Sequence, residues 1–327
     1  MQDMILMADP KSKSWEFARK IHDYIKNEKG IDIPLRMVDI RYFNNNEIDM
    51  HVPQNVRKRD IYFIHDSTKS PQDWWVQLLL LKDLLLSASA NSVTFVLPDM
   101  LYSRKDRKDK PHVPISARAF ADSISPGLRR VITVDLHAAQ VQGFYPAHVP
   151  LDNLYSFPVI VRFLKENKIL GNPEELVVLS PDVGGVERAR NFANRLGSRY
   201  SIAFMYKRRD KPGEVGEMIL VGEVTGKDVL IVDDIIDSGG TLCKASELLK
   251  KNGAKNIYCY GTHGLFTKGL DELQKHFAII MTSNTNYRDK DGLVVVDLAP
   301  LFAEAVYRAQ MGQSISELFD NGNEGKN

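Results

Sequence analysis

Residues 229–242 read Val-Leu-Ile-Val-Asp-Asp-Ile-Ile-Asp-Ser-Gly-Gly-Thr-Leu, and this stretch decides the fold. Its first four residues are apolar and β-favouring, which is typical of a strand buried in a parallel sheet. Two carboxylates, Asp233 and Asp234, follow at the carboxyl end of the predicted strand. A loop of small residues then leads into a helix that we expect to begin at Thr241. The stretch therefore predicts a strand, loop and helix unit of an α/β sheet.

The loop of this unit is suited to a phosphorylated sugar. Gly239 and Gly240 let the backbone come close to a ligand, and the first N–H groups of a helix carry partial positive charge without internal partners. Asp233 and Asp234 accept hydrogen bonds only, so they suit a pair of ribose hydroxyls or a hydrated magnesium ion. An ordinary βα turn would also use Asp and Gly. It does not explain two adjacent carboxylates directly after an all-apolar strand.

Two other phosphate signatures are not supported. Residues 222–228 superficially match a Walker loop, but they have one residue too few between the glycines and carry Asp228 where Ser or Thr should bind magnesium. We interpret this segment as a hairpin turn. No GxGxxG follows a predicted strand, so the sequence does not indicate dinucleotide binding.

Composition limits the class of protein. The chain has 327 residues, 43% of them hydrophobic and 26% charged, which is typical of a soluble globular protein of two domains. The formal net charge of +1 gives no general attraction to nucleic acid or membrane. Cys243 and Cys259 form no CxxC motif, and we expect both to be packing residues in a reducing cytoplasm. The start of the chain has no leader pattern, and the apolar segment 74–90 is too short and too interrupted to span a bilayer. That segment predicts a helix sandwiched inside a domain or presented to another subunit.

Strand and helix patterns alternate in both halves of the chain. Alternation of this kind predicts two parallel sheets, each covered on both faces, with a boundary near residues 150–153. The predicted strands are residues 5–7, 35–38, 61–64, 93–97, 131–134, 176–179, 202–205, 229–232, 257–260, 278–281 and 294–296. The predicted helices are residues 15–26, 73–89, 116–125, 157–166, 186–196, 241–251 and 270–276.

Candidate site residues follow the strands, because ligands of such sheets gather at the carboxyl ends of strands. A lone histidine is usually structural, but His137 follows one strand end and Asp182 holds a matching place in the other half. This placement favours a role with magnesium or phosphate. Two basic segments, residues 102–110 and 206–214, also leave ligand-facing strand ends. Such cations are what a polyphosphate reaction requires.

The chain resembles the ribose-phosphate diphosphokinases, and the similarity extends from the first strand to Phe319. The matching segments are residues 43–47, 107–110, 114–116, 135–138, 149–155, 180–185, 233–241 and 262–264. Simple phosphoribosyltransferases share only the sugar loop. The resemblance implies an α/β fold of two consecutive doubly wound domains of the type I phosphoribosyltransferase kind. Residues 1–151 would form the first domain, joined by 309–322, and residues 152–308 the second.

The resemblance implies transfer of the diphosphoryl group of MgATP to the anomeric hydroxyl of ribose 5-phosphate, with Mg2+ as cofactor. Lys207, Arg209 and His137 would be catalytic, and His137 and Asp182 would organise magnesium. The ATP site would comprise Phe43, Asn45, Glu47, Arg104, Lys105 and Asp106, with Phe43, Asn45 and Glu47 supplied by a neighbouring subunit. The ribose 5-phosphate site would comprise Asp182, Asp233, Asp234, Asp237, Ser238, Gly239, Gly240 and Thr241. The family implies a cytoplasmic homo-oligomer built from dimers, with a hexamer as one candidate.

The chain also departs from the family pattern. Lys105 stands where the family carries Gln, which affects the expected adenine contacts, and Trp74-Trp75 replaces a usual Asn-Leu pair near the expected subunit interface. A regulatory anion site would use Lys110, His112, Ser314 and Ser316, although His112 stands where Arg is common. Two rival interpretations are a non-catalytic regulatory relative and a phosphoribosyl-binding transcription sensor. The first is disfavoured by Lys207, Arg209 and His137, and the second by the lack of a DNA-binding segment.

Overall fold

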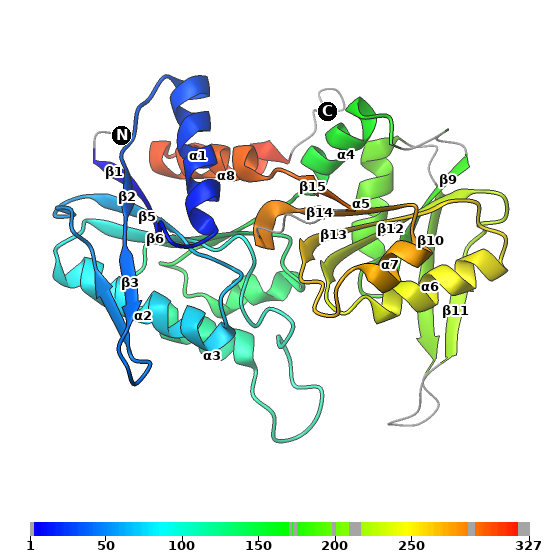
Figure 1. The fold of residues 1–327 in the computed structure, drawn as a ribbon, viewed down its shortest axis with the longest axis horizontal. Helices are drawn as coiled ribbons and strands as arrows, with labels where there is room; N and C mark the ends of the chain where they lie inside the picture. The colour runs from blue at the N-terminus through cyan, green and yellow to red at the C-terminus, as the bar shows by residue number, and fades with distance from the viewer. Residues whose placement is uncertain are drawn as a thin grey trace. The chain divides into compact units, whose positions relative to one another are not determined.

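The computed structural model describes residues 3–169, 172, 175–197, 201–208, 217–286 and 292–319. Contacts divide the chain into two compact units. The first comprises Met1–Tyr155, Thr285–Tyr287 and Leu298–Asn327, and the second Ser156–Asn284 and Arg288–Asp297. Both contain a predominantly parallel sheet, as the alternating pattern predicts (Figure 1).

The first unit contains a six-stranded parallel sheet in the order β2-β1-β5-β6-β7-β8. Helices α1 and α8 cover one face, and α2 and α3 cover the other (Figure 1). Side chains of one strand alternate between the two faces, so Ile5 and Met7 of β1 join the core beneath α2 and α3. The strands are β1 (Met4–Ala8), β2 (Leu35–Met37), β5 (Asp60–Ile64), β6 (Ser92–Val96), β7 (Arg130–Val134) and β8 (Leu151–Leu154), and the helices are α1 (Ser14–Lys29), α2 (Pro71–Ser87), α3 (Ser116–Ile124) and α8 (Ala299–Met311).

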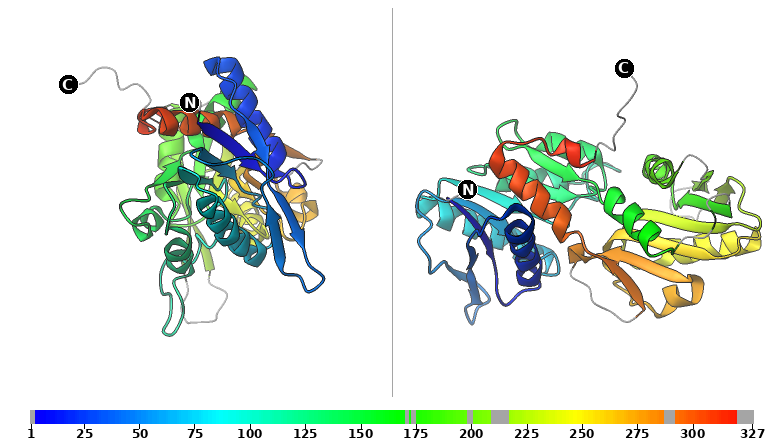
Figure 2. Two further views of the ribbon diagram at one scale, coloured as in Figure 1. Left: turned by 90° about the vertical axis from the view of Figure 1, so that its left-hand side faces the viewer. Right: turned by 90° about the horizontal axis from the view of Figure 1, so that it is seen from above.

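Helix α8 is an element that the sequence pattern missed. It returns to the first unit and lies beside α1, as the right-hand view of Figure 2 shows. Phe302 packs edge to face on Phe17 with ring centroids 5.4 Å apart, and Tyr24 donates a hydrogen bond to Glu304 at 2.9 Å. The sequence-based boundary placed residues up to 308 in the second domain, whereas the contacts group residues from Leu298 onward with the first unit.

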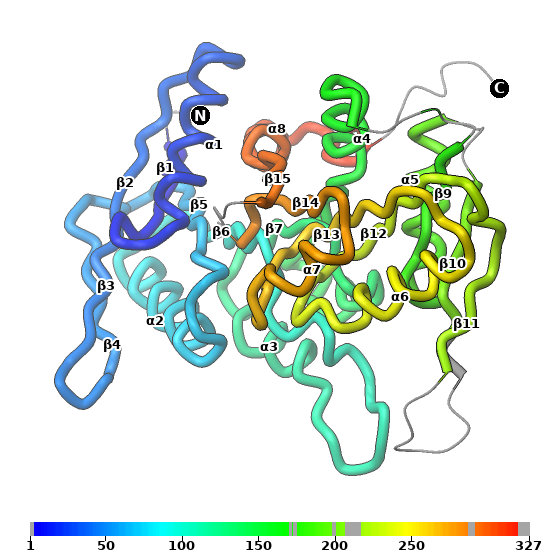
Figure 3. The backbone as a smooth tube through the Cα atoms, turned by 45° about the vertical axis from the view of Figure 1, so that its right-hand side comes forward, coloured from blue at the N-terminus to red at the C-terminus, as the bar shows by residue number. Residues whose placement is uncertain are grey.

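A two-stranded antiparallel hairpin, β3 (Asp39–Tyr42) and β4 (Ile48–His51), forms a separate small sheet in the first unit. The sequence pattern did not predict it. Ile40 lies in the core under α2, with Ile48 and Met50 packed against it, and the hairpin extends outward from there (Figure 3). The hairpin therefore carries its turn, residues 43–47, away from the main sheet.

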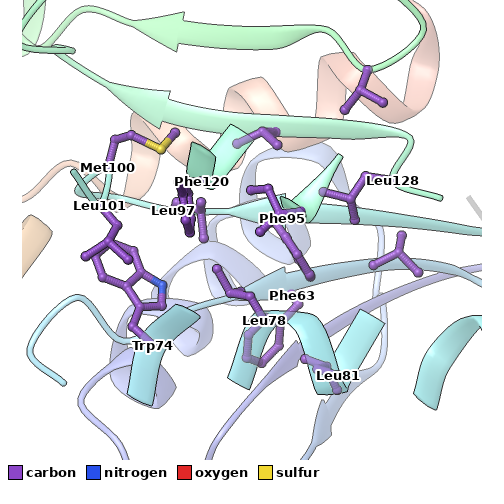
Figure 4. Close-up of a cluster of buried hydrophobic side chains, with 14 of the residues drawn as sticks. Phe63, Trp74, Leu78, Leu81, Phe95, Leu97, Met100, Leu101, Phe120 and Leu128 are labelled. Carbon is purple, nitrogen blue, oxygen red and sulfur yellow. The ribbon is translucent and has the colours of Figure 1, made fainter. Parts of the chain in front are cut away.

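Both residues of the Trp74-Trp75 pair lie on helix α2 and pack inside the first unit. Trp74 is buried in the apolar core of the unit (Figure 4). It stacks on His65 with ring centroids 5.1 Å apart. Trp75 donates its indole N–H to Ser123 Oγ at 2.7 Å and contacts the rings of Tyr102 and Phe120. Within the ranges that the structure describes, no helix is both long enough and apolar enough to cross a membrane.

The second unit contains a seven-stranded sheet in the order β11-β10-β9-β12-β13-β14-β15, in which only the edge pair β10 and β11 is antiparallel. The interpretation of residues 222–228 as a hairpin turn is wrong, because β9 and β10 lie between β11 and β12 in the sheet. The strands are β9 (Leu176–Ser180), β10 (Ser201–Arg208), β11 (Glu217–Val221), β12 (Asp228–Ile236), β13 (Ile257–Gly264), β14 (Ile279–Ser283) and β15 (Leu293–Val296), and the helices are α4 (Phe157–Glu166), α5 (Val186–Leu196), α6 (Gly240–Lys251) and α7 (Asp271–His276).

Candidate functional site

The acidic pair lies inside strand β12 and not beyond its end. The strand continues to Ile236, and Asp233 is in register with Gly261 of β13. The loop that follows is short, because α6 begins at Gly240, one residue earlier than the sequence predicts. Gly239 caps the helix with φ of 76°, and a Cβ at this position would lie 2.8 Å from Leu273. Both the backbone conformation and the space therefore require glycine here.

The loop between β12 and α6 presents backbone N–H groups at its helix end. Asp237 is held by Thr267, whose hydroxyl donates to Asp237 Oδ1 at 2.8 Å and whose N–H donates to the Asp237 carbonyl at 3.0 Å. The N-cap residue is Gly239, so it has no side chain to cover the first N–H groups of α6. A phosphate group can accept hydrogen bonds from these groups and also gains from the helix dipole.

Arg188 bridges the two carboxylates, and sequence reasoning missed this residue. Its Nη1 lies 3.0 Å from Asp234 Oδ1 and 3.4 Å from Asp233 Oδ1. The side chain of Asp234 is buried, whereas about a fifth of the Asp233 side chain is exposed. Burial, and then the charge of Asp234, raise the pKa of Asp233 well above its usual range, while Arg188 acts against that rise. Arg188 lies in the first turn of α5, the helix that follows the carboxyl end of β9. A basic residue at that position is the sequence signal that could have identified it.

Asp182 joins this cluster from the neighbouring strand. Strand β9 pairs with β12 in parallel, so their carboxyl ends meet at one edge of the sheet. Ser180 donates its hydroxyl to the carbonyl of Asp182 at 2.6 Å, and Gly185 N–H donates to Asp182 Oδ1 at 3.0 Å. The charge of Asp182 also contributes to the raised pKa of Asp233. The second unit therefore places Asp182 close to the acidic pair that Arg188 bridges.

His137 lies in the first unit, after β7, in a turn that β8 holds. Asp135 adopts a left-handed conformation with φ of 44°, an uncommon one for a residue other than glycine. Its N–H donates to the carbonyl of Leu154 at 2.9 Å, and the N–H of Leu136 donates to Asn153 Oδ1 at 3.0 Å. These bonds stabilise the strained turn and leave the side chain of His137 exposed at the carboxyl end of β7.

The predicted adenine residues occupy the exposed turn of the β3–β4 hairpin. Phe43 is 56% exposed, and its N–H donates to the carbonyl of Glu47 at 2.9 Å. Asn46 has φ of 66°, and Asn45 accepts a hydrogen bond from the N–H of Glu47 at 3.2 Å. The turn is therefore an ordered support that presents an aromatic face beside polar side chains.

The predicted ATP loop connects β6 to α3. Arg104 and Lys105 are exposed, and Lys105 pairs with Asp109 at 3.3 Å. Asp106 accepts a hydrogen bond from Gln140, which follows His137 along the chain. The cations of the loop therefore reach solvent on the same unit as His137.

The structure does not bring the four predicted regulatory residues together within one chain. Ser314 and Ser316 follow α8 on one side of the first sheet, and their hydroxyls lie 2.9 Å apart. Arg308 holds this segment by donating to the Ser314 carbonyl at 2.7 Å. Lys110 and His112 belong to the loop before α3, which extends on the opposite side (Figure 1).

One of the two predicted transition-state cations, Lys207, belongs to the last residues of β10. Lys207 is in register with Met218 of β11, but its side chain lies outside the described residues, as does Arg209. Among the described residues, no group of three or more His, Cys, Asp or Glu side chains is arranged to hold a metal ion alone. Magnesium is commonly held by one or two carboxylates together with substrate phosphates and water, so the oxygen donors of Asp182 and Asp233 fit it.

Comparisons with known proteins find relatives over most of the chain. Residues 9–126 match the family model for the N-terminal domain of ribose phosphate pyrophosphokinase, and residues 151–299 match the phosphoribosyl transferase domain. A ribose-phosphate pyrophosphokinase of Rhizobium meliloti is 41% identical over 89% of this chain and 94% of its own length. One from Helicobacter hepaticus is 37% identical over 93% of this chain and 98% of its own.

A solved structure gives the same result for the fold. The crystal structure of phosphoribosylpyrophosphate synthetase from Mycobacterium smegmatis superposes with a TM-score of 0.82 and 29% identity. The match covers 95% of this chain and 99% of that one. It confirms the predicted fold of two type I phosphoribosyltransferase-like domains. The chain therefore belongs to the ribose-phosphate pyrophosphokinase family.

Proposed function

We propose that this chain transfers the diphosphoryl group of MgATP to the anomeric hydroxyl of ribose 5-phosphate, producing 5-phosphoribosyl 1-diphosphate and AMP. The observation that carries the proposal is the acidic pair Asp233 and Asp234, held by Arg188 one short loop away from an uncovered helix N-terminus. That spacing suits a sugar with hydroxyls at one end and phosphate at the other. The near full-length similarity to ribose-phosphate pyrophosphokinases supports the same reaction.

Ribose 5-phosphate would bind across the loop between β12 and α6. The backbone of residues 237–241 and the side chains of Ser238 and Thr241 would hold the 5-phosphate, with the dipole of α6 adding attraction. Asp233 and Asp234 would accept hydrogen bonds from the ribose hydroxyls. Arg188 would keep the buried carboxylate of Asp234 compensated before the sugar arrives.

ATP would bind through elements of the first unit. Phe43 would stack on adenine, while Asn45 and Glu47 read its edge, and Arg104, Lys105 and Asp106 would contact the rest of the nucleotide. Asp182 and His137 would help to organise Mg2+, whose charge would neutralise the transferring phosphates. Lys105 supplies a cation where relatives carry an amide, so we expect it to act on phosphate and not on adenine.

Catalysis would depend on positioning and on neutralisation of charge. The anomeric hydroxyl attacks the β-phosphorus in line, a bond to that phosphorus forms, and the bond to the oxygen of the departing AMP breaks. Lys207 and Arg209 would contact the transferring group as its charge moves.

We also propose that the enzyme acts in the cytoplasm as an oligomer built from dimers. Lys110, His112, Ser314 and Ser316 would then form an anion site between subunits.

One assay tests the proposed reaction directly. The purified protein is incubated with MgATP and ribose 5-phosphate, and AMP and 5-phosphoribosyl 1-diphosphate are measured. We expect equal amounts of both products from the wild type. We also expect a fall in kcat of about a hundredfold or more in Lys207→Ala, with little change in either KM, because a cation that acts on transition-state charge is lost. Release of ADP instead of AMP, or wild-type turnover in Lys207→Ala, would contradict the proposal.

A further inference from the structure

Four polar side chains from four parts of the first unit form a continuous hydrogen-bonded chain. Asp9 follows β1, Lys69 precedes α2, Gln77 lies on α2, and Tyr42 is the last residue of β3. Lys69 Nζ lies 2.9 Å from Asp9 Oδ2 and 3.2 Å from Gln77 Oε1. Gln77 Nε2 in turn donates to the hydroxyl of Tyr42 at 2.9 Å. We call this set the tyrosine tether.

Burial and donor chemistry fix the orientation of the Gln77 amide in the tyrosine tether. Gln77 is 1% exposed and Asp9 is 5% exposed, so breaking their hydrogen bonds would leave buried polar groups unpaired. The ammonium group of Lys69 can only donate, so the oxygen of the Gln77 amide must face it. The amide nitrogen is therefore turned toward Tyr42. The ion pair with Asp9 holds Lys69 in the position that this arrangement needs.

The tyrosine tether ends beside the turn of the β3–β4 hairpin. Tyr42 directly precedes Phe43, and it forms the last pair of the hairpin with Ile48. The two strands of the hairpin pair with each other and not with the six-stranded sheet, although Val38, directly before β3, still donates its N–H to the end of β1 at 3.0 Å. The sheet therefore anchors the start of β3, and side-chain contacts set the direction of the hairpin beyond that point. The apolar ones, such as those of Ile40, lie nearer the base, whereas the hydroxyl of Tyr42 is held close to the turn.

We propose that Gln77, oriented by Lys69 and Asp9, is a positioning residue that acts through Tyr42 to aim the turn of residues 43–47 at the adenine ring. The inference rests on the proposed function, because it takes this turn to receive adenine. A small rotation of the hairpin is amplified at its tip, so loss of the bond would misplace Phe43 without removing it. ATP binding would then weaken, while ribose 5-phosphate binding in the other unit would not change.

The test compares Tyr42→Phe and Gln77→Leu with the wild type in steady-state kinetics. Each variant removes the bond between Gln77 and Tyr42, and we expect each to raise KM for ATP by a factor of about 2 to 10, the range of one neutral hydrogen bond. We expect kcat and KM for ribose 5-phosphate to stay within about twofold of the wild type. The double variant should be no worse than Gln77→Leu alone, because both changes remove the same bond.

The chain offers a matched control and a conservative replacement. Tyr62 donates to Gln310 of α8 at 3.0 Å in the same unit, in a bond that does not involve the hairpin, so Tyr62→Phe removes a bond of the same kind and should leave KM for ATP unchanged. Gln77→Glu should stay near the wild type, because a carboxylate can accept from both Lys69 and the hydroxyl of Tyr42. Thermal unfolding of every variant checks that the first unit is folded.

The variant Phe43→Ala separates the positioning role of Gln77 from the proposal that the turn receives adenine. If Phe43→Ala raises KM for ATP but Tyr42→Phe and Gln77→Leu do not, the adenine site stands and the positioning role is overturned. An equal rise of KM in Tyr62→Phe would overturn it too, because general loosening of the unit would then explain the effect. If Phe43→Ala leaves KM for ATP unchanged while AMP is still produced, the turn does not receive adenine. The tyrosine tether then has no role in ATP binding.

Discussion

At the scale of single residues, the candidate site places like charges next to each other at a cost in stability. Asp233 has a raised pKa because it is largely buried beside Asp234, and one arginine serves both carboxylates. A carboxyl group whose folded-state pKa is raised loses stabilisation as the pH rises from the unfolded value of about 3.9 through the folded value. The raised pKa of Asp233 therefore lowers the stability of the folded protein at neutral pH, a cost that a ligand-binding role explains.

Asp233→Asn is therefore expected to stabilise the protein and to impair it. Without substrates at pH 7.5, we expect its free energy of unfolding to rise, because the amide replaces a carboxyl group whose pKa is raised by burial. Turnover at low ribose 5-phosphate should fall at least tenfold. Denaturant unfolding and a titration of ribose 5-phosphate measure the two effects. Arg188→Met should instead destabilise the protein, since it leaves the buried carboxylate of Asp234 unpaired. Equal destabilisation by both changes would contradict this account.

A second residue-scale effect concerns His65. It is 1% exposed, and burial, followed by the charge of Lys69, keeps its pKa well below the usual range. In the unfolded chain the histidine has a pKa of about 6.5 and takes up a proton below that pH, whereas the buried histidine of the folded protein does not. The stability of the folded protein is therefore unaffected above about pH 6.5 and decreases as the pH falls below it. We expect the free energy of unfolding to decrease from pH 7 to pH 5.5. His65→Gln should flatten that decrease, and an equally steep decrease in this variant would contradict the account. Urea unfolding at several pH values decides between these outcomes.

At the scale of elements, the sugar loop, the adenine turn and the turn before His137 are short and held by regular structure. The sugar loop joins β12 to α6 through a left-handed glycine, and the adenine turn joins β3 to β4 through Asn46. The turn before His137 depends on β8, a strand that the sequence pattern missed. Rigid elements therefore set the geometry, while the turns carry the chemistry.

Gly239→Ala tests this dependence on backbone geometry. Its φ of 76° strains any other residue, and the added Cβ would lie 2.8 Å from Leu273. The matched control is Gly226→Ala, with φ of 71° and nothing within 4 Å of the added Cβ. We expect about 1 kcal/mol of destabilisation in the control and more in Gly239→Ala, together with a higher KM for ribose 5-phosphate only in the latter. Thermal unfolding and kinetics on the two proteins provide the comparison. Equal effects would show that the close approach is unimportant.

At the scale of the whole molecule, the family resemblance implies that adenine is received by residues of a neighbouring subunit. The hairpin that would provide adenine contacts extends outward from its own sheet (Figure 3). Helix α2 also exposes apolar side chains, Val76 at 44% and Leu80 at 41%, which suit a surface that another subunit covers. These features support a site shared between subunits.

Mixing two inactive variants tests the shared site. Glu47→Ala removes an adenine contact, and Lys207→Ala removes a transition-state cation. If each active site takes these residues from different subunits, exchange between the two proteins produces some sites in which both are intact. We expect partial recovery of AMP production after exchange and none when the variants are mixed without it. Persistent inactivity, with subunit exchange verified by differently tagged chains, would refute the shared site.

The sequence by itself determined the two sheets and the residues of the sugar loop, because apolar periodicity, adjacent carboxylates and glycines are local signals. It predicted twelve residues that the structure describes at or beside four strand-end or hairpin turns, namely Phe43, Asn45, Glu47, His137, Asp182, Asp233, Asp234, Asp237, Ser238, Gly239, Gly240 and Thr241. Tertiary structure alone decided the ion pair between Arg188 and the acidic residues, the return of α8 to the first unit, and the tyrosine tether. Gln77 and Tyr42 are 35 residues apart, and Arg188 and Asp233 are 45 apart. No local pattern encodes such pairs, because burial and contact arise only when distant segments pack together.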